Sequence, residues 1–144
     1  MPLSKDNRRD AIVNVAIIGC GNMGTQIAQV YLEAGLQVFL MDVDEGRVRQ
    51  TEETIRSRLL QKGLDPAAVM QGCSMVSSVE DLYDVQLVQE AVPEDLKLKQ
   101  ELFHELDSQL PETTILATNS SSFSISEVAA HCRRPERVLG VHWV

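Results

Sequence analysis

Three glycines near the start of the chain have the spacing of a loop that binds phosphate groups. Gly19, Gly21 and Gly24 form the pattern G-x-G-x-x-G between an apolar run rich in β-branched residues and an amphipathic stretch. In this context the first glycine permits a tight turn, the second lets the backbone approach a pyrophosphate, and the third lets a helix pack closely on a strand. The free N–H groups at the start of that helix would then bind the anion. The pattern predicts a dinucleotide site.

An aspartate follows the glycines at the distance that such a site needs. Asp42 ends the second expected strand, about 20 residues further along the chain. Its carboxylate can accept hydrogen bonds from an adenosine ribose and would repel a 2′-phosphate, so we expect NAD rather than NADP as the cofactor. Arg47, five residues further along the chain, would favour the phosphate instead. A glycine turn with a capping aspartate and no ligand is the alternative without function, and a flavin site would need further elements.

These residues need a scaffold, and the rest of the chain alternates short apolar runs with longer amphipathic ones. Strands alternating with helices imply right-handed crossovers and a parallel sheet. The predicted fold is therefore α/β, with the doubly wound parallel sheet of a Rossmann-type dinucleotide-binding domain. The expected strands cover residues 11–18, 37–41, 85–92, 113–118 and 137–144, and the expected helices cover residues 23–34, 44–62, 94–110 and 125–130, with a short helix and a short strand within 65–79.

Length and charge limit the kinds of protein that this chain can be. Its 144 residues fit one domain, so we assign residues 1–144 to one NAD-binding domain and expect residues 1–10 to be flexible. The formal net charge of −8 argues against binding to nucleic acid or to an anionic membrane surface, because both repel an acidic protein. No apolar run reaches the roughly 18 residues that a membrane-spanning helix needs.

The cysteines and the N-terminus indicate a compartment. The three cysteines are far apart and have no histidine at metal-ligand spacing, so we expect reduced thiols, no metal site and a cytoplasmic protein. The first ten residues have no apolar core and do not resemble a secretory signal, although Arg8 and Arg9 would also suit the remnant of an organellar presequence.

Four blocks of the sequence resemble the 3-hydroxyacyl-CoA dehydrogenase family, and the resemblance covers almost the whole chain. They are GCGNMGTQIAQV from Gly19, LVQEAVPEDLKLKQELF over 87–103, ILATNSSSFSISEVA over 115–129 and RPERVLGVHWV over 134–144. Other β-hydroxyacid dehydrogenases share the glycine loop with its methionine, but not the two middle blocks in this order. The resemblance implies the N-terminal NAD-binding domain of an oxidoreductase of fatty acid metabolism. Its reaction would be the reversible, NAD-dependent oxidation of a 3-hydroxyacyl-CoA, or a related thioester, to the 3-ketoacyl form.

The resemblance also assigns cofactor contacts beyond the glycine loop. Ala91 would contribute backbone on the nicotinamide side, and Glu94 and Lys99 would make polar contacts with NAD. Glu94 also has a simpler explanation, since an acidic residue favours a helix N-terminus. The predicted cofactor-binding set is Gly19, Gly21, Asn22, Met23, Gly24, Asp42, Ala91, Glu94, Lys99 and Ser121.

Two residues are candidates for the chemistry itself. His142 matches the family's catalytic histidine, and an imidazole with an ordinary pKa of about 6.5 can take the hydroxyl proton at neutral pH. Without the family, a lone histidine near a strand end would more often be structural. Ser121 matches a serine that lies beside the substrate hydroxyl and the nicotinamide. Serines in such a segment also cap helices and form turns, which is the structural alternative and the one favoured for Ser122.

The end of the chain departs from the family pattern. Where the family reads G-x-H-F-F-N-P, this chain reads Gly140, Val141, His142, Trp143, Val144. The family's asparagine, the glutamate that orients its histidine and the helical C-terminal domain that closes the substrate cleft and builds the homodimer are absent. We therefore expect the isolated chain to bind NAD but to be catalytically incomplete, and the intact protein to be a homodimer.

The acyl carrier is the least determined feature. By the resemblance, Arg58 and Lys62, four residues apart on one helix face, are the candidates to bind the phosphates of coenzyme A. A solvated helix face balanced by Glu52 and Glu53 explains the same residues. Coenzyme A is the favoured carrier, while a carrier-protein thioester stays open. The alternative functions are a non-catalytic module that senses NAD(H) or mediates an interaction, and a dehydrogenase of small β-hydroxy acids.

Overall fold

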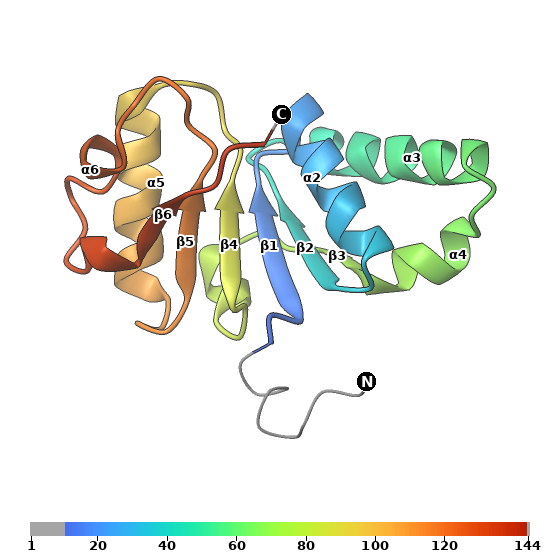
Figure 1. Ribbon diagram of the computed structural model, residues 1–144, viewed down its shortest axis with the longest axis horizontal. Coiled ribbons are helices and arrows are strands. Elements are labelled where there is room, and N and C mark those ends of the chain that lie inside the picture. Colours follow the sequence, from blue (N-terminus) through green and yellow to red (C-terminus); the bar gives the residue numbers. More distant parts are fainter. Residues whose placement is uncertain (1–10, 144) are drawn as a thin grey trace.

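The computed structural model describes residues 11–143 and consists of one six-stranded parallel sheet with helices on both faces (Figure 1). The strand order is β3-β2-β1-β4-β5-β6. The strands are β1 (Asn14–Ile18), β2 (Gln37–Met41), β3 (Cys73–Met75), β4 (Leu87–Glu90), β5 (Ile115–Thr118) and β6 (Val138–Gly140). The helices are α2 (Asn22–Glu33), α3 (Glu45–Gln61), α4 (Pro66–Val69), α5 (Leu96–Gln109) and α6 (Ile125–Val128), with 3₁₀ turns η1 (Met70–Gly72), η2 (Val79–Leu82) and η3 (Pro135–Arg137).

Two hydrophobic cores lie on the two faces of the sheet, and the residues of β1 alternate between them. Val15 and Ile17 pack with α2 and α3, whereas Ala16 and Ile18 pack with α5 and α6. A strand that is buried on both faces has no polar face, which explains the continuous apolar run from which it was predicted. The predicted α/β fold with a parallel sheet is thereby confirmed.

The glycine loop follows β1, the strand at which the chain reverses the direction in which it adds strands to the sheet. β1 lies between β2 and β4, so the chain proceeds toward β3 on one side and toward β6 on the other. The connections that follow β1 and β4 lead to helices on opposite faces of the sheet, and a cavity lies beside them at the carboxyl edge, where ligands of such folds bind.

Most of the expected elements are present, with shorter ends. The strand expected over 37–41 is β2 without change, and Gly35, with φ of +86°, follows the end of α2 as predicted. The strand expected over 85–92 ends at Glu90, and the helix expected from 94 begins at Leu96 after the capping residue Asp95, whose carboxylate accepts from Leu98 N.

The strand expected over residues 137–144 is present as β6, but it is shorter than predicted. β6 ends at Gly140, and the chain then crosses the carboxyl edge of the sheet. Val141 N still donates to Thr118 O, which continues the pairing with β5 by one residue, whereas Trp143 N donates to the side chain of Asn119 and not to the main chain of a strand. Residues 1–10, expected to be flexible, and Val144 lie outside the described residues.

A buried ion pair that the sequence did not predict joins α5 to the start of β6. Arg137 Nη2 lies 3.0 Å from Asp107 Oδ1, and both side chains are almost completely buried. The same guanidinium donates to the main-chain oxygens of Asp107, Pro111 and Thr114, so it also caps the end of α5. No helix within residues 11–143 is long and apolar enough to cross a membrane.

Arg137→Met should lower the free energy of unfolding by about 3–5 kcal/mol, because it leaves the carboxylate of Asp107 buried without its counter-charge. Urea denaturation followed by circular dichroism measures the change. Arg134→Met is the matched control: it removes only the exposed partner of Glu112, 3.5 Å away, and should cost less than about 1 kcal/mol. Similar losses in both variants would contradict the role given to the buried pair.

Candidate functional site

Two of the three loop glycines are required by packing within the protein. Gly19 has φ of +106°, and a Cβ there would lie 2.5 Å from Ala91 O. A Cβ on Gly24 would overlap the carbonyl oxygen of Gly19. The loop therefore fits against β4 and folds back on itself only if these positions carry no side chain.

The middle glycine has a different reason to lack a side chain. Gly21 precedes α2 as its N-terminal capping residue with φ of −85°, a conformation open to any residue. Apart from Gly21 itself and its two chain neighbours, no atom of the described residues would lie within 4 Å of a Cβ at this position. Packing within the protein would therefore allow a side chain at Gly21. A pyrophosphate bound at the N-terminus of α2 would exclude one, because both would occupy the same space. The loop fits a bound dinucleotide.

Asp42 connects the end of β2 to the glycine loop. Its Oδ2 accepts from Cys20 N at 2.8 Å, and its Oδ1 accepts from Asp44 N at 2.9 Å. Each oxygen keeps a lone pair for a further donor. Asp42 and Gly19 border a cavity of about 340 Å³. Its other walls are mainly apolar, with Val43, Val92, Pro93, Leu98 and Leu102 among the lining residues, and Arg47, Glu101 and Glu105 also line it. Such a cavity suits an aromatic ring joined to a ribose.

The cysteines, including the one inside the glycine loop, are free thiols, as the sequence predicted. Burial and the nearby carboxylate of Asp42 raise the pKa of Cys20 to about 11. Burial also raises the pKa of Cys73 to about 12 and that of Cys132 to about 11. These thiols are neutral at physiological pH, which makes them poor nucleophiles. Within residues 11–143 no group of three His, Cys, Asp or Glu side chains could hold a metal ion.

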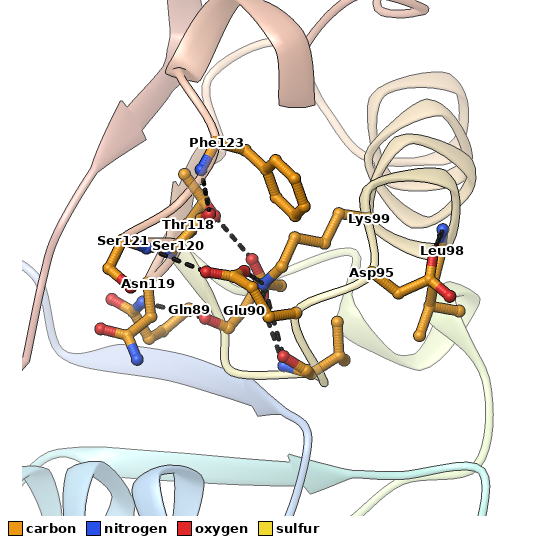
Figure 2. Close-up of polar contacts among 12 residues, drawn as sticks. Gln89, Glu90, Asp95, Leu98, Lys99, Thr118, Asn119, Ser120, Ser121 and Phe123 are labelled. Carbon is orange, nitrogen blue, oxygen red and sulfur yellow. Dashed lines mark hydrogen bonds and ion pairs between the residues drawn. The ribbon is translucent and has the colours of Figure 1, made fainter.

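A buried ion pair lies at the carboxyl end of β4 (Figure 2). Glu90 and Lys99 are 0% and 2% exposed, and Lys99 Nζ lies 2.6 Å from Glu90 Oε2. Glu90 Oε1 accepts from Thr118 Oγ1 at 2.6 Å, and Oε2 also accepts from Val92 N at 2.8 Å. The sequence analysis missed Glu90; the one signal for it was a charged residue inside an otherwise apolar strand.

Glu94 connects the Glu90–Lys99 pair to the loop that follows β5, residues 119–122, here called the serine loop. Lys99 Nζ lies 3.2 Å from Glu94 Oε1, and Glu94 Oε2 accepts from Ser121 N at 3.1 Å and Ser122 N at 3.2 Å. Burial alone would raise the pKa of Glu94, but the hydrogen bonds from Lys99 and from Ser120, Ser122 and Ser121 outweigh it and lower the pKa to about 2. The carboxylate is therefore charged at neutral pH and fixes the loop.

Glu94 and Lys99, which were predicted to make polar contacts with NAD, thus both form hydrogen bonds and ion pairs within the protein. Lys99 Nζ donates to Glu90, Glu94 and the main-chain oxygen of Val92, so each of its three hydrogens has an acceptor. Its direct contact with NAD stays a prediction, as does that of Glu94, which is 36% exposed. In the glycine loop, Asn22 is exposed and Met23 is half-buried against the α2 core.

The candidates for chemistry meet at the same edge of the sheet. Ser121 follows β5 and His142 follows β6, and both side chains are exposed. Because β5 and β6 are neighbouring parallel strands, their carboxyl ends lie side by side. The residue after His142 is fixed on three sides. Trp143 N donates to Asn119 Oδ1 at 2.7 Å, its indole Nε1 donates to Gln89 Oε1 at 3.3 Å, and its ring meets that of Tyr31 edge-on at 5.4 Å.

The structure does not bring Arg58 and Lys62 to this edge. Lys62 Nζ forms an ion pair with Glu33 Oε1 at 2.5 Å. Glu33 is the last residue of α2, which begins at the glycine loop, so Lys62 lies at the far end of that helix, about 17 Å along its axis. Arg58, one turn earlier on α3, borders a shallow surface depression formed by the same helix.

Comparison with known proteins identifies a related family. Residues 14–144 match the family described as "3-hydroxyacyl-CoA dehydrogenase, NAD binding domain". The chain is 35% identical over 138 residues to a 3-hydroxybutyryl-CoA dehydrogenase of Clostridioides difficile, covering 91% of this chain and 49% of the relative. It is 37% identical over 144 residues to one from Mycobacterium tuberculosis, covering 93% and 50%.

Solved structures agree with this match. The crystal structure of a 3-hydroxybutyryl-CoA dehydrogenase from Escherichia coli K12 superposes with a TM-score of 0.88 at 34% identity, covering 92% of this chain and 30% of that one. A malate dehydrogenase from Plasmodium falciparum, at 14% identity and a TM-score of 0.69, shares the fold alone. The chain spans about half the length of the curated relatives that it matches first.

Alanine substitutions should distinguish a loop glycine that is required by packing from one that leaves space for a ligand. Gly24→Ala is expected to lower the free energy of unfolding by about 2 kcal/mol or more, because its Cβ would overlap backbone. Gly21→Ala should cost less than about 1 kcal/mol, since its Cβ would enter open space at a helix N-terminus. Urea unfolding of both variants measures the difference, and a larger loss at Gly21 would contradict the described loop.

The depressed pKa of Glu94 makes part of the stability depend on pH. Since its folded pKa lies near 2, below the ordinary 4.5, its stabilisation is complete above about pH 4.5 and is lost as the pH falls to about 2. Glu94→Gln should therefore be less stable than the wild type at neutral pH, and this gap should shrink between about pH 5 and pH 2. Urea unfolding across this range measures the gap, and Glu136→Gln, at an exposed glutamate, is the control. A gap that does not change with pH would refute the assignment.

Proposed function

The chain belongs to the 3-hydroxyacyl-CoA dehydrogenase family, in which it matches the NAD-binding domain, and from this premise we propose that it carries the NAD site of an enzyme that oxidises 3-hydroxyacyl thioesters. The reaction is the reversible transfer of a hydride from C3 of a 3-hydroxyacyl-CoA to NAD, with loss of the hydroxyl proton, which leaves the 3-ketoacyl form. The relatives named above are 3-hydroxybutyryl-CoA dehydrogenases, which favours a short acyl chain.

The observation that carries the proposal is the empty space beside Gly21. The other two glycines are explained by packing, whereas this one leaves the N-terminus of α2 open to a ligand. The N–H groups and the dipole of α2 would bind the pyrophosphate there. Asp42 would accept from the adenosine ribose with its remaining lone pairs and repel a 2′-phosphate, and the adjacent apolar cavity would hold the adenine ring.

The residues at the carboxyl edge of the sheet would each have a different role in the reaction. NAD, when bound, supplies the acceptor of the hydride. The imidazole of His142 takes the proton of the C3 hydroxyl as the C–H bond breaks, and returns it in the reverse direction. The hydroxyl of Ser121 donates a hydrogen bond to the substrate oxygen and holds it in place. The backbone of Ala91 borders the nicotinamide, and Glu94 and Lys99 support that side of the site.

Three further points belong to the proposal. Arg58 and Lys62 would meet the phosphates of coenzyme A only if the carrier reached from the carboxyl edge of the sheet to the surface of α3, since Lys62 lies at the far end of α2. The protein would act as a homodimer, and it would be cytoplasmic, a compartment in which its free thiols stay reduced.

NADH binding can be followed through Trp143, the only tryptophan, which adjoins His142. Excitation of the indole should give saturable energy transfer to bound NADH and a weaker signal with NADPH. Gly21→Ala should weaken NADH binding by about tenfold or more while the chain stays folded, because the new Cβ occupies the space of the pyrophosphate. No signal with either nucleotide, together with no heat in calorimetry, would reduce the glycine loop to a turn.

The role of His142 is tested by activity with acetoacetyl-CoA and NADH, measured on this chain and on the longest form of the protein that contains it. His142→Gln should lower kcat about 10²- to 10⁴-fold and leave the Kd of NADH within about twofold. His131→Gln, at an exposed histidine elsewhere, is the control. An unchanged kcat would refute the role of His142. NADH binding without turnover in any form would support a sensing or interaction module instead.

A further inference from the structure

Two successive side chains of β4 are polar and completely buried. Gln89 and Glu90 are both 0% exposed, in a strand where a parallel sheet normally carries apolar residues. Side chains alternate along a strand, so Gln89 points to the face covered by α2 and Glu90 to the face covered by α5. A buried polar group is costly unless it is hydrogen-bonded, and both of these are.

The Glu90 branch leads to the loop that carries Ser121. From Glu90 the contacts run through Lys99 to Glu94, whose carboxylate accepts the N–H groups of Ser121 and Ser122 (Figure 2). A second arm reaches the same loop, because Thr118 Oγ1 donates to Glu90 and accepts from Ser120 N at 3.1 Å. One carboxylate thus fixes the serine loop along two routes.

The Gln89 branch leads to the segment that carries His142. Gln89 Oε1 accepts from the indole Nε1 of Trp143, while its Nε2 donates to Glu90 O at 3.2 Å. On the other side of His142, Val141 N donates to Thr118 O at 2.9 Å. The histidine therefore stands exposed between two neighbours that are both fixed.

We propose that Gln89 and Glu90 are positioning residues, Gln89 for His142 and Glu90 for Ser121. The end of β4 then sets the position of His142 relative to Ser121. The catalytic meaning of this arrangement rests on the proposed function. Stability alone does not require the arrangement, because a buried ion pair can often be replaced by apolar residues without loss. Fixed geometry between reacting groups does require it, because small displacements of such groups lower the rate.

The Gln89 branch can be tested by the exchange of single protons with water, measured by NMR on the free chain. Gln89→Met keeps the volume of the side chain and removes the acceptor. The indole N–H of Trp143 should then exchange about tenfold faster, the equivalent of one hydrogen bond, while the amides of Ser121 and Ser122 stay within about twofold. Gln100→Met, which removes a bond from α5 to the main chain of Glu127, is the matched control and should change neither signal.

The Glu90 branch should give the opposite pattern. Glu90→Gln combined with Lys99→Met removes both charges, so no unpaired charge is left buried to unfold the chain. The amides of Ser121 and Ser122 should exchange about tenfold faster, and the indole N–H should stay within about twofold. Glu112→Gln with Arg134→Met removes an exposed pair and is the control. If both variants move both signals, or neither moves its own, the proposal is overturned.

A kinetic measurement separates positioning from mere stability. In the form of the protein that turns over, each variant should lower kcat by about 10- to 100-fold with the KM of the thioester within about twofold. Loss of folded protein alone would lower the yield of active enzyme without the two separate exchange patterns, and an unchanged kcat in both variants would overturn the proposal. The exchange rates need neither cofactor nor turnover. A failure of NADH to bind would therefore refute the proposed function and leave the exchange result to be judged separately.

Discussion

The close approach of the glycine loop to the end of β4 is the constraint on which the rest of the structure depends. Gly19 N donates to Met41 O on one side, and Ala91 N donates to Ile18 O on the other. The loop is held between two strands, and the backbone of Ala91 occupies the place of a side chain at Gly19. The contact between Gly19 and the backbone of Ala91 sets the direction of the first turn of α2 and places the loop beside Asp42. One backbone contact therefore orients the whole nucleotide site.

A second constraint acts at the same edge, where buried charge replaces apolar packing. Glu90 and Lys99 are costly to remove from water, and every buried side-chain nitrogen and oxygen within the described residues has a hydrogen-bond partner. A fully bonded network of this kind defines one geometry, whereas an apolar cluster tolerates several. Buried charge also occurs away from the site, in the Arg137–Asp107 pair, while both faces of the sheet are otherwise packed mainly by apolar residues. Structure and proposed chemistry share the end of β4.

The middle of each element could be predicted from the sequence, but not every end. The limits of β2 follow from its apolar run and the turns that flank it, which are local signals. The end of β6 does not, because the side chains of Asn119 and Gln89, distant in the sequence, bind the main-chain N–H and the indole N–H of Trp143. Hydrogen bonds between distant segments leave no periodicity that a sequence pattern could reveal.

The sequence by itself determined the fold class, the glycine loop with its aspartate, and the family, because each is written in local patterns of glycine, charge and apolar spacing. Only the tertiary structure decided what the polar residues touch. It buried Lys99 against Glu90, joined Glu94 to the serine loop, paired Arg137 with Asp107 and placed Lys62 at the far end of α2. The physical reason is that a residue's type sets how strongly it needs a partner. Which partner it finds depends on the strand order and on the helices that the chain brings together.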